Sequence, residues 1–407
     1  MSLIPDYSQY AGLGEKDQAI AFRHPDLFLV RRGIMRIECG LWHNYVIKDL
    51  GESNVKIFCA ADLGAGGIKI KASAVGMPAT VAYLPSLLSW AEEKNILVGD
   101  ARLVDPAAFG LGGRWYFAGE SVSDRLLNAE DVAVSPILKV ENALPLLLAC
   151  LIKKIKLRPG QYEVCLVASH HDPNSMGAML REKLEGTHTS VKAGEEYGFT
   201  VKLPRVGIVG EGSALNVAVD DGCEGYGFGV LDLGYLTSIF SLRDDDGAII
   251  RATEPKANGT HKLILMLAQH QEFRALLGGV CPELDAIAIA LVEASREKKN
   301  KLFYRRGGKA IDFTPIYGKV MPAWIKQAAG DARLSIQERQ GTPYQAIAIG
   351  GGCNLPGVAP TLKSVGIKVS KELDPIFANV ESIYLKHVKP AMKSGEFAAS
   401  KVELQHA

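Results

Sequence analysis

The sequence lacks a surplus of charge of either sign. Its 46 lysines and arginines nearly balance 45 aspartates and glutamates, which leaves a formal net charge of +1. A protein that holds nucleic acid or an anionic membrane through its overall field is strongly basic. We therefore expect this chain to make no direct contact with nucleic acid or with a membrane.

Long apolar runs and paired cysteines are also missing. The longest apolar run, over residues 143–152, is interrupted by Pro145 and is well short of the ~20 residues that a spanning helix needs. The seven scattered cysteines contain no C-x-x-C pair, so neither a zinc site nor a disulfide framework is indicated. No basic segment followed by an apolar stretch opens the sequence, so we expect no signal peptide and a cytoplasmic location.

Several familiar catalytic patterns are absent as well. The sequence has no G-x-x-x-x-G-K-[ST] phosphate loop and no G-x-S-x-G nucleophile turn. His170, His171 and Asp172 look like a metal or acid–base cluster. A pair of histidines in a loop is more often polar surface, and we interpret these residues in that way.

What the chain does have is apolar material for two to three domains and a regular alternation of strands and helices. Hydrophobic residues make up 47% of its 407 positions. Residues 1–49 form an N-terminal extension without a clear pattern, and the alternation after it predicts an α/β architecture. Strands are predicted over 55–61, 68–71, 162–169, 197–203, 205–210, 229–233, 237–243, 248–252 and 345–349, with strands or loops over 75–88 and 115–119. Helices are predicted over 142–155, 175–184, 214–219, 261–271, 284–298, 322–329 and 375–387.

A glycine-rich turn follows the first predicted strand. The pattern is Asp62-x-Gly64-x-Gly66-x-x-Lys69. Glycines at such a turn let backbone N–H groups face phosphate oxygens, the lysine adds a point charge, and the aspartate suits a magnesium ion held mostly through water. Taken alone, the pattern fits a tight hairpin between core strands equally well.

A second strand, over 229–233, also ends in Asp-x-Gly. Asp232 could hold the same magnesium ion from the opposite side of a cleft, and Thr237 and Ser238 could bond a terminal phosphate. Taken alone, this segment is more typical of an ordinary hairpin with a buried or capping aspartate. The recurrence of the turn nevertheless indicates a duplicated α/β core with a cleft between its halves.

Two further segments place glycines at strand ends. The predicted strand 345–349 runs into Gly350, Gly351 and Gly352, where a base or a phosphate could approach the backbone. Three consecutive glycines are entropically costly, which favours this interpretation over a simple strand–turn–helix junction. Glu211 is flanked by Gly210 and Gly212 and could orient a water for attack on phosphate. By itself it is more simply a helix-terminal acid.

The order of these four segments resembles the actin superfamily of ATPases. Residues 62–69, 210–214, 232–238 and 349–355 are similar to its phosphate-1, connect-1, phosphate-2 and adenosine motifs. Within that superfamily the chain looks most like the bacterial actin-like proteins of the plasmid-partition (ParM-like) type. One departure is Tyr235, which stands with Leu236 where the family usually has two glycines.

The resemblance implies an actin-like, ribonuclease H-like fold of two α/β domains with a nucleotide cleft between them. Domain I would comprise residues 50–229 and 376–407, and domain II residues 230–375. ATP or GTP would bind with Mg²⁺ held through water by Asp62 and Asp232, and Glu211 would act with these two aspartates in hydrolysis. The nucleotide-binding residues implied are Gly64, Ala65, Gly66, Gly67, Lys69, Gly234, Tyr235, Thr237, Ser238, Gly259, Gly350, Gly351, Gly352 and Asn354.

The same resemblance implies self-association into filaments that change with nucleotide. Such a protein would serve plasmid or DNA segregation, with a separate DNA-binding adaptor, or act as a bacterial cytoskeletal element. Two alternatives stay open at this point. One is a small-molecule kinase of the same superfamily, acting on a sugar or an acid, and the other is a scaffold that keeps the fold without hydrolysis.

Overall fold

The computed structural model describes residues 55–74, 77–92, 107–124, 135–213, 215, 227–245, 247–297, 299, 301–306, 309–370 and 374–394. The predicted extension over 1–49 and the predicted helix over 214–219 lie outside these residues, apart from position 215. Among the described residues, no helix combines the length and the apolar character needed to cross a membrane.

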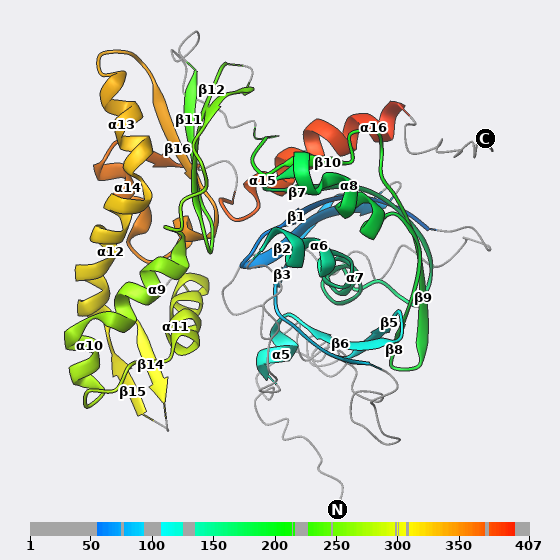
Figure 1. Ribbon diagram of the computed structural model, residues 1–407, viewed down its shortest axis with the longest axis horizontal. Helices are drawn as coiled ribbons and strands as arrows, with labels where there is room; N and C mark the ends of the chain where they lie inside the picture. Colours follow the sequence, from blue (N-terminus) through cyan, green and yellow to red (C-terminus); the bar gives the residue numbers. More distant parts are fainter. Residues whose placement is uncertain are drawn as a thin grey trace, which may run out of the picture.

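The first half of the chain forms a strongly curved sheet of ten strands in the order β3-β2-β1-β7-β9-β8-β5-β6-β4, with β10 on β7 (Figure 1). In this sheet β1 lies between β2, to which it is antiparallel, and β7, to which it is parallel. β7 is in turn parallel to β9 and β10. The strands are β1 (Val55–Leu63), β2 (Gly67–Ala74), β3 (Thr80–Pro85), β4 (Leu88–Glu92), β5 (Phe109–Leu111), β6 (Arg114–Ala118), β7 (Gly160–His170), β8 (Gly186–Lys192), β9 (Glu195–Lys202) and β10 (Ile208–Gly210).

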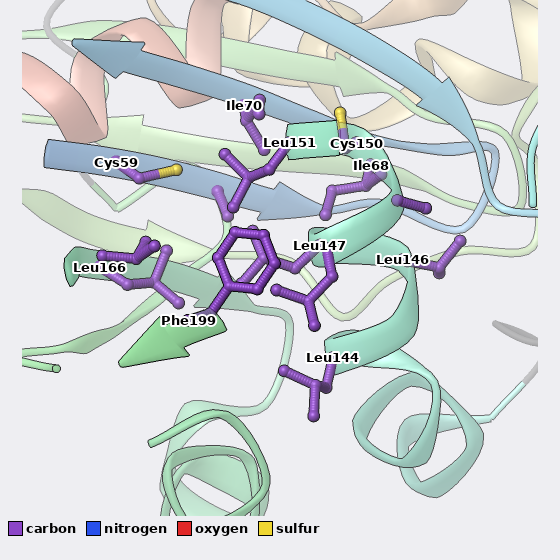
Figure 2. Packing of buried hydrophobic residues seen from close by; sticks show 14 of the residues in the cluster. Cys59, Ile68, Ile70, Leu144, Leu146, Leu147, Cys150, Leu151, Leu166 and Phe199 are labelled. Atoms are coloured by element: carbon purple, nitrogen blue, oxygen red, sulfur yellow. The ribbon is translucent and has the colours of Figure 1, made fainter. Parts of the chain in front are cut away.

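The helix α7 (Ala143–Lys153) fills the concave side of this sheet. All of its residues except Lys153 are buried, so it is apolar on every side and needs neighbours all round. Figure 2 shows its leucines packed against side chains of β1, β2, β7 and β9, including Phe199. The other helices of this half are α5 (Glu120–Asp124), α6 (Pro136–Glu141) and α8 (Pro173–Leu184).

A second, five-stranded sheet has the order β13-β12-β11-β16-β17. Its strands are β11 (Phe228–Leu233), β12 (Ser238–Arg243), β13 (Ile249–Ala252), β16 (Gln345–Ile349) and β17 (Ile367–Val369), and a separate pair is formed by β14 (Phe303–Arg306) and β15 (Lys309–Asp312). The associated helices are α9 (Thr260–Gln269), α10 (Gln271–Leu276), α11 (Leu284–Arg296), α12 (Thr314–Ala328), α13 (Gly330–Glu338), a 3-10 turn (Gly351–Asn354) and α14 (Val358–Ser364). Their core is organised around buried aromatic side chains such as Trp324 and the stacked pair Phe273 and Phe313.

The end of the described chain returns to the first sheet. It comprises α15 (Ala378–Ile383), a π-helical turn (Tyr384–Val388) and α16 (Lys389–Ser394). Phe377, Val380 and Ile383 pack against Phe58 and Ala60 of β1, on the face of the sheet opposite α7. The first sheet is therefore covered on both faces, as Figure 1 shows. The division into domains at residues 229 and 376 stays a prediction.

The predicted strands and helices that the structure describes are present, with shifted ends. The largest shift concerns the helix predicted over 322–329, because α12 begins at Thr314 and carries Pro322 in its interior. The predicted start at Pro322 was wrong, because α12 holds this proline in its interior, a position from which proline is usually excluded. The elements that were not predicted are β4, β5, β8, the β14–β15 pair, β17, α5, α6, α10, α13, α14 and α16.

Candidate functional site

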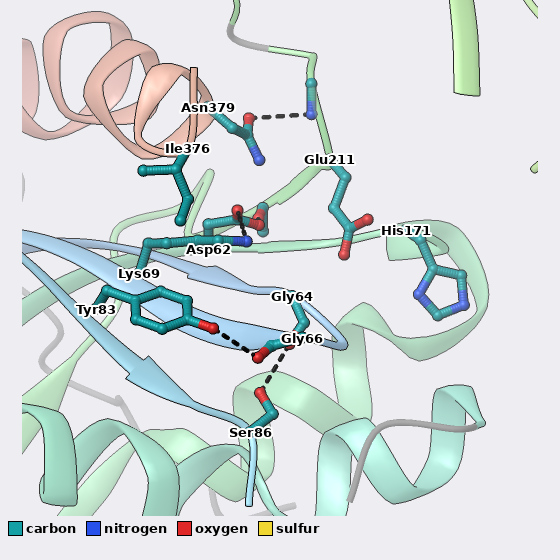
Figure 3. Close-up of polar contacts among 12 residues, drawn as sticks. Asp62, Gly64, Gly66, Lys69, Tyr83, Ser86, His171, Glu211, Ile376 and Asn379 are labelled. Carbon is teal, nitrogen blue, oxygen red and sulfur yellow. Dashed lines mark hydrogen bonds and ion pairs between the residues drawn. The ribbon is translucent and has the colours of Figure 1, made fainter. Parts of the chain in front are cut away.

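The first candidate turn is a β-hairpin that the third strand braces. In the β1–β2 pair, Asp62 lies opposite Lys69, so the turn occupies residues 64–66. The hydroxyl groups of Ser86 and Tyr83 donate hydrogen bonds to the carbonyl oxygens of Gly64 and Gly66, each at 2.8 Å. Figure 3 shows both contacts at the tip of the hairpin. The backbone of the tip is thus fixed from one side.

Asp62 is a buried carboxylate with two polar partners. Its side chain accepts hydrogen bonds from Lys69 Nζ at 3.2 Å and from the Ser169 hydroxyl at 2.9 Å. The second bond follows from register, because Asp62 and Ser169 are paired between β1 and β7. Burial raises the pKa of Asp62, but the charges of Lys69 and Lys139 and these hydrogen bonds outweigh burial, so the pKa is lowered overall. Asp62 is therefore ionised at neutral pH.

The second hairpin brings Asp232 into the same electrostatic environment. β11 and β12 pair Leu233 with Ser238, and the turn is closed by a hydrogen bond from the Gly234 N–H to the Thr237 carbonyl. Burial and the negative charge of Asp62, together with that of Glu211, raise the pKa of Asp232 to about 7. Lys69 and Lys139 oppose this shift only in part. The two aspartates belong to different sheets, and the contact between their hairpin tips, at Gly66 and Tyr235, brings them together.

The tips of the two hairpins are also in direct contact. A Cβ atom added at Gly66 would lie 2.7 Å from the Cβ of Tyr235. Real Cβ atoms do not approach so closely, so the absence of a side chain at Gly66 is what allows Tyr235 to cover this tip. At Gly64 an added Cβ would lie 2.9 Å from the carbonyl oxygen of Gly67, so the backbone of the turn also leaves little room for a side chain there.

The glycines after β16 join the site through Asp232. β16 is parallel to β11 and pairs Ile349 with Asp232, so Gly350 follows at the edge where Asp232 lies. Gly350 has φ of 91°, and an added Cβ would lie 2.5 Å from Asp232 Oδ1. Gly351 lies near Ile376, and Gly352 is buried against Leu233. Close packing alone therefore accounts for Gly350 and Gly352, and their contact with a nucleotide stays a prediction.

Other predicted residues have structural partners of their own. The N–H groups of Gly259, Thr260 and His261 donate to carbonyl oxygens in the turn of the second hairpin, so this turn caps α9. Ser238 is only 3% exposed, and the Asn354 amide donates to Asp374 at 3.3 Å. These hydrogen bonds and this burial lie within the protein and do not test nucleotide binding, so the predicted nucleotide contacts of Gly259, Ser238 and Asn354 stay predictions. Ala65, Gly67, Gly234 and Thr237 lie in or beside the two hairpin turns.

Glu211 lies at the same edge of the first sheet as Asp62. It follows β10, whose last residue, Gly210, pairs with His170 of β7. Its carboxylate accepts a 2.5 Å hydrogen bond from Lys139 Nζ. The next residue, Gly212, donates its N–H to the side chain of Asn379 on α15 at 3.0 Å (Figure 3). The returning C-terminal helix therefore positions the Glu211 turn.

A histidine pair also lies at this edge, and the interpretation of these residues as polar surface was wrong for His170. His170 is 0% exposed and its ring stacks on that of His171, with the centroids 4.4 Å apart. His171 Nδ1 lies 3.3 Å from Lys139 Nζ. Burial, and after it the charge of Lys139, lowers the pKa of both histidines, so both are neutral at pH 7. The signal that could have identified them is their position at the carboxyl end of a central parallel strand, where ligands bind in α/β sheets.

Lys139 is the other residue that sequence reasoning missed. It lies on α6, is 7% exposed, and contacts both Glu211 and His171. No motif marks it, because its partner Glu211 is 72 positions away in the chain. The site thus holds a buried cation, Lys139, and a half-buried one, Lys69, beside the carboxylates of Asp62, Asp232 and Glu211.

The acidic residues fit a magnesium ion bound together with phosphate rather than by the protein alone. Among the described residues, no group of three or more histidine, cysteine, aspartate or glutamate side chains is placed to hold a metal. Mg²⁺ commonly takes one or two carboxylates and completes its shell with water and phosphate oxygens. Asp62 and Asp232 supply such a pair.

Comparison with known proteins shows the fold. No protein-family pattern matches the sequence, and no curated protein sequence matches it significantly. Among solved structures, Bacillus thuringiensis ParM with ATP superposes with a TM-score of 0.57 at 16% identity, covering 83% of this chain and 100% of that one. The actin-like protein Alp7A gives a TM-score of 0.57 at 15% identity, with 84% and 98% covered. The archaeal actin homologue Ta0583 gives 0.57 at 16%, with 84% and 99% covered. The chain therefore has the actin-like fold of ParM-type proteins, which confirms the predicted fold class.

Proposed function

We propose that the protein is an actin-like ATPase that binds ATP with Mg²⁺ between its two aspartate hairpins and assembles into filaments. One observation carries the proposal: Asp62 and Asp232, from different sheets, lie on two hairpins that are in direct contact. The glycine hairpins that carry them touch at Gly66 and Tyr235. The likeness to ParM with ATP supports the choice of nucleotide.

Each residue then has a role that its surroundings support. Asp62 and Asp232 hold Mg²⁺ through water, and this ion, when bound, neutralises charge on the phosphates. Lys69 steadies the phosphates, and Glu211 orients the attacking water. The segment Gly350–Gly352 contacts the adenosine end, or that of GTP if guanosine is accepted.

The biological setting is also part of the proposal. Filaments of a cytoplasmic protein of this kind would move plasmid DNA or form a cytoskeletal element. The net charge of +1 favours an indirect link to DNA through an adaptor protein. An adaptor would be found by co-sedimentation of its candidates with assembled filaments.

Sedimentation and light scattering of the full chain with ATP, with ADP and without nucleotide test the proposal. We expect assembly with ATP and Mg²⁺, loss of assembly as phosphate is released, and little assembly without nucleotide. Equal scattering under all three conditions, together with no nucleotide binding, would refute it.

A scaffold without hydrolysis is the second candidate, and one observation favours it. Tyr235 covers the tip of the first hairpin at Gly66, and the family usually has glycine at the position of Tyr235. In that case nucleotide binds without phosphate release. A phosphate-release assay on the assembled protein separates the two candidates, because only the ATPase releases phosphate.

A further inference from the structure

Lys139 is a buried cation that uses only part of its capacity to donate hydrogen bonds. Its ammonium group carries three N–H donors. One reaches Glu211 Oε1 at 2.5 Å and a second lies 3.3 Å from His171 Nδ1. Among the described residues the third donor has no partner. His171 is neutral because burial and Lys139 itself lower its pKa, so its Nδ1 can accept this hydrogen bond at pH 7.

The charge of Lys139 reaches the centre of the candidate site. It favours the ionised forms of both Asp62 and Asp232. Lys69 is paired with Asp62, and Lys139 is paired with Glu211. The chain therefore balances most of its own charge here, and a triphosphate can gain a cation only by competing with one of these carboxylates.

Resting on the proposed function, we infer that Lys139 binds the terminal phosphate of ATP by exchanging its Glu211 partner for a phosphate oxygen. His171 stays in contact with the ammonium group and keeps it at the site during the exchange. The exchange releases the Glu211 carboxylate, which then holds the attacking water. Binding of the third phosphate and release of the Glu211 carboxylate therefore occur together. ADP lacks this phosphate and leaves the Lys139–Glu211 ion pair intact.

Binding constants for ADP and for the non-hydrolysable analogue AMPPNP test this exchange on the full chain, by calorimetry in the presence of Mg²⁺. We expect Lys139→Gln to weaken AMPPNP at least about tenfold, the loss typical of a hydrogen bond between charged groups. ADP affinity should change less than about threefold. Lys71→Gln is the control, because it breaks a partly buried lysine–glutamate pair, Lys71 with Glu381 at 2.7 Å, outside the site. It should leave the ratio of the two affinities unchanged.

Glu211→Gln gives the complementary test and keeps Lys139. Removing the competing carboxylate frees Lys139, so AMPPNP should bind several-fold more tightly while ADP is unaffected. This gain should vanish in the double variant Lys139→Gln/Glu211→Gln. Because the double variant leaves no unpaired buried charge, it can also be used if Lys139→Gln alone fails to fold. A merely structural lysine would change both affinities equally or neither.

The outcomes distinguish failure of the Lys139 exchange from failure of the proposed function. If the parent protein binds neither nucleotide, the proposed function itself fails. If the parent binds both, but Glu211→Gln leaves AMPPNP affinity unchanged or lowers it, the exchange is refuted and the proposed function stands.

Discussion

Replacement of Asp232 by asparagine should change how the stability of the protein depends on pH. The pKa of Asp232 is raised to about 7 in the folded protein, against an ordinary value of 3.8. The folded state therefore binds this proton more tightly than the unfolded state does. The resulting stabilisation is complete below about pH 4 and is lost as pH rises through 7.

The size of the effect follows from these two pKa values. Linkage gives a contribution of about 2.7 kcal/mol at pH 5 and nearly zero at pH 8. Asparagine cannot ionise, so the variant lacks this dependence. Relative to the parent, the variant should therefore gain about 2.5 kcal/mol of unfolding free energy between pH 5 and pH 8.

The comparison must be a difference between variant and parent, because other groups act in the opposite direction. The lowered pKa values of His170 and His171 contribute stability above about pH 6.5 that is lost as pH falls. Asp62, with a lowered pKa, acts in the same direction, but only near and below pH 4. Both contributions are largely shared by parent and variant and cancel in the difference.

Urea unfolding at pH 5, 6, 7 and 8, followed by tryptophan fluorescence in metal-free buffer, measures this difference. Trp324 is 0% exposed in the core of the half that contains Asp232. Asp331→Asn, which breaks the exposed pair with Lys256 at 2.6 Å, is the control and should change stability by less than about 1 kcal/mol at every pH. A flat difference curve for Asp232→Asn would refute the raised pKa of Asp232, and with it the combined effect of burial and of the Asp62 charge at this site.

Three further predictions address the same site and its support. Glu211→Ala should leave ADP binding intact, slow phosphate release at least a hundredfold (about 3 kcal/mol in barrier) and prolong the polymers; release at the parental rate would remove its role. Gly66→Ala forces a Cβ to within 2.7 Å of that of Tyr235 and should weaken nucleotide binding at least about tenfold (about 1.4 kcal/mol). The control is Gly318→Ala, where nothing lies within 4 Å, and equal affinities in the two variants would contradict the tip contact. Phe377→Ala removes a buried ring that packs on β1 and should cost about 3–5 kcal/mol of unfolding free energy, measured by urea unfolding; a loss below about 1 kcal/mol would mean that the returning helix does not support the first sheet.

The hairpins could be predicted from the sequence because their information is local. An apolar run, Asp-x-Gly and a returning run specify strand, turn and strand within about fifteen residues, and β1–β2 and β11–β12 follow this pattern. The order of such segments along the chain was also enough to predict the fold class. The edge strand β17 and the small β14–β15 pair were missed because short strands carry too few residues for a period to emerge.

The remaining parts of the site are set by contacts between distant segments. Lys139 and Glu211 are 72 positions apart, and Gly212 and Asn379 are 167 apart. His170 resembles a loop residue in the sequence but is the last residue of a central strand. Its position directly after the predicted strand over 162–169 was the one available signal. Whether that strand is central, and the histidine therefore buried, depends on the sheet order, which is a property of the whole fold.

These contacts also show how the site is divided between the two halves of the molecule. Asp62 and Glu211 are positioned by the first sheet and its helices, through Ser169, Lys139 and Asn379. Asp232 is positioned by the second sheet, whose hairpin turn caps α9. The tip contact and the field between the carboxylates act across the two halves.

A movement of one half against the other would change the energy of Asp232 beside Asp62 while leaving each hairpin intact. Because a bound cation would screen this repulsion, nucleotide with Mg²⁺ should favour the closer arrangement. The raised pKa of Asp232 reflects burial first and the repulsion from Asp62 second.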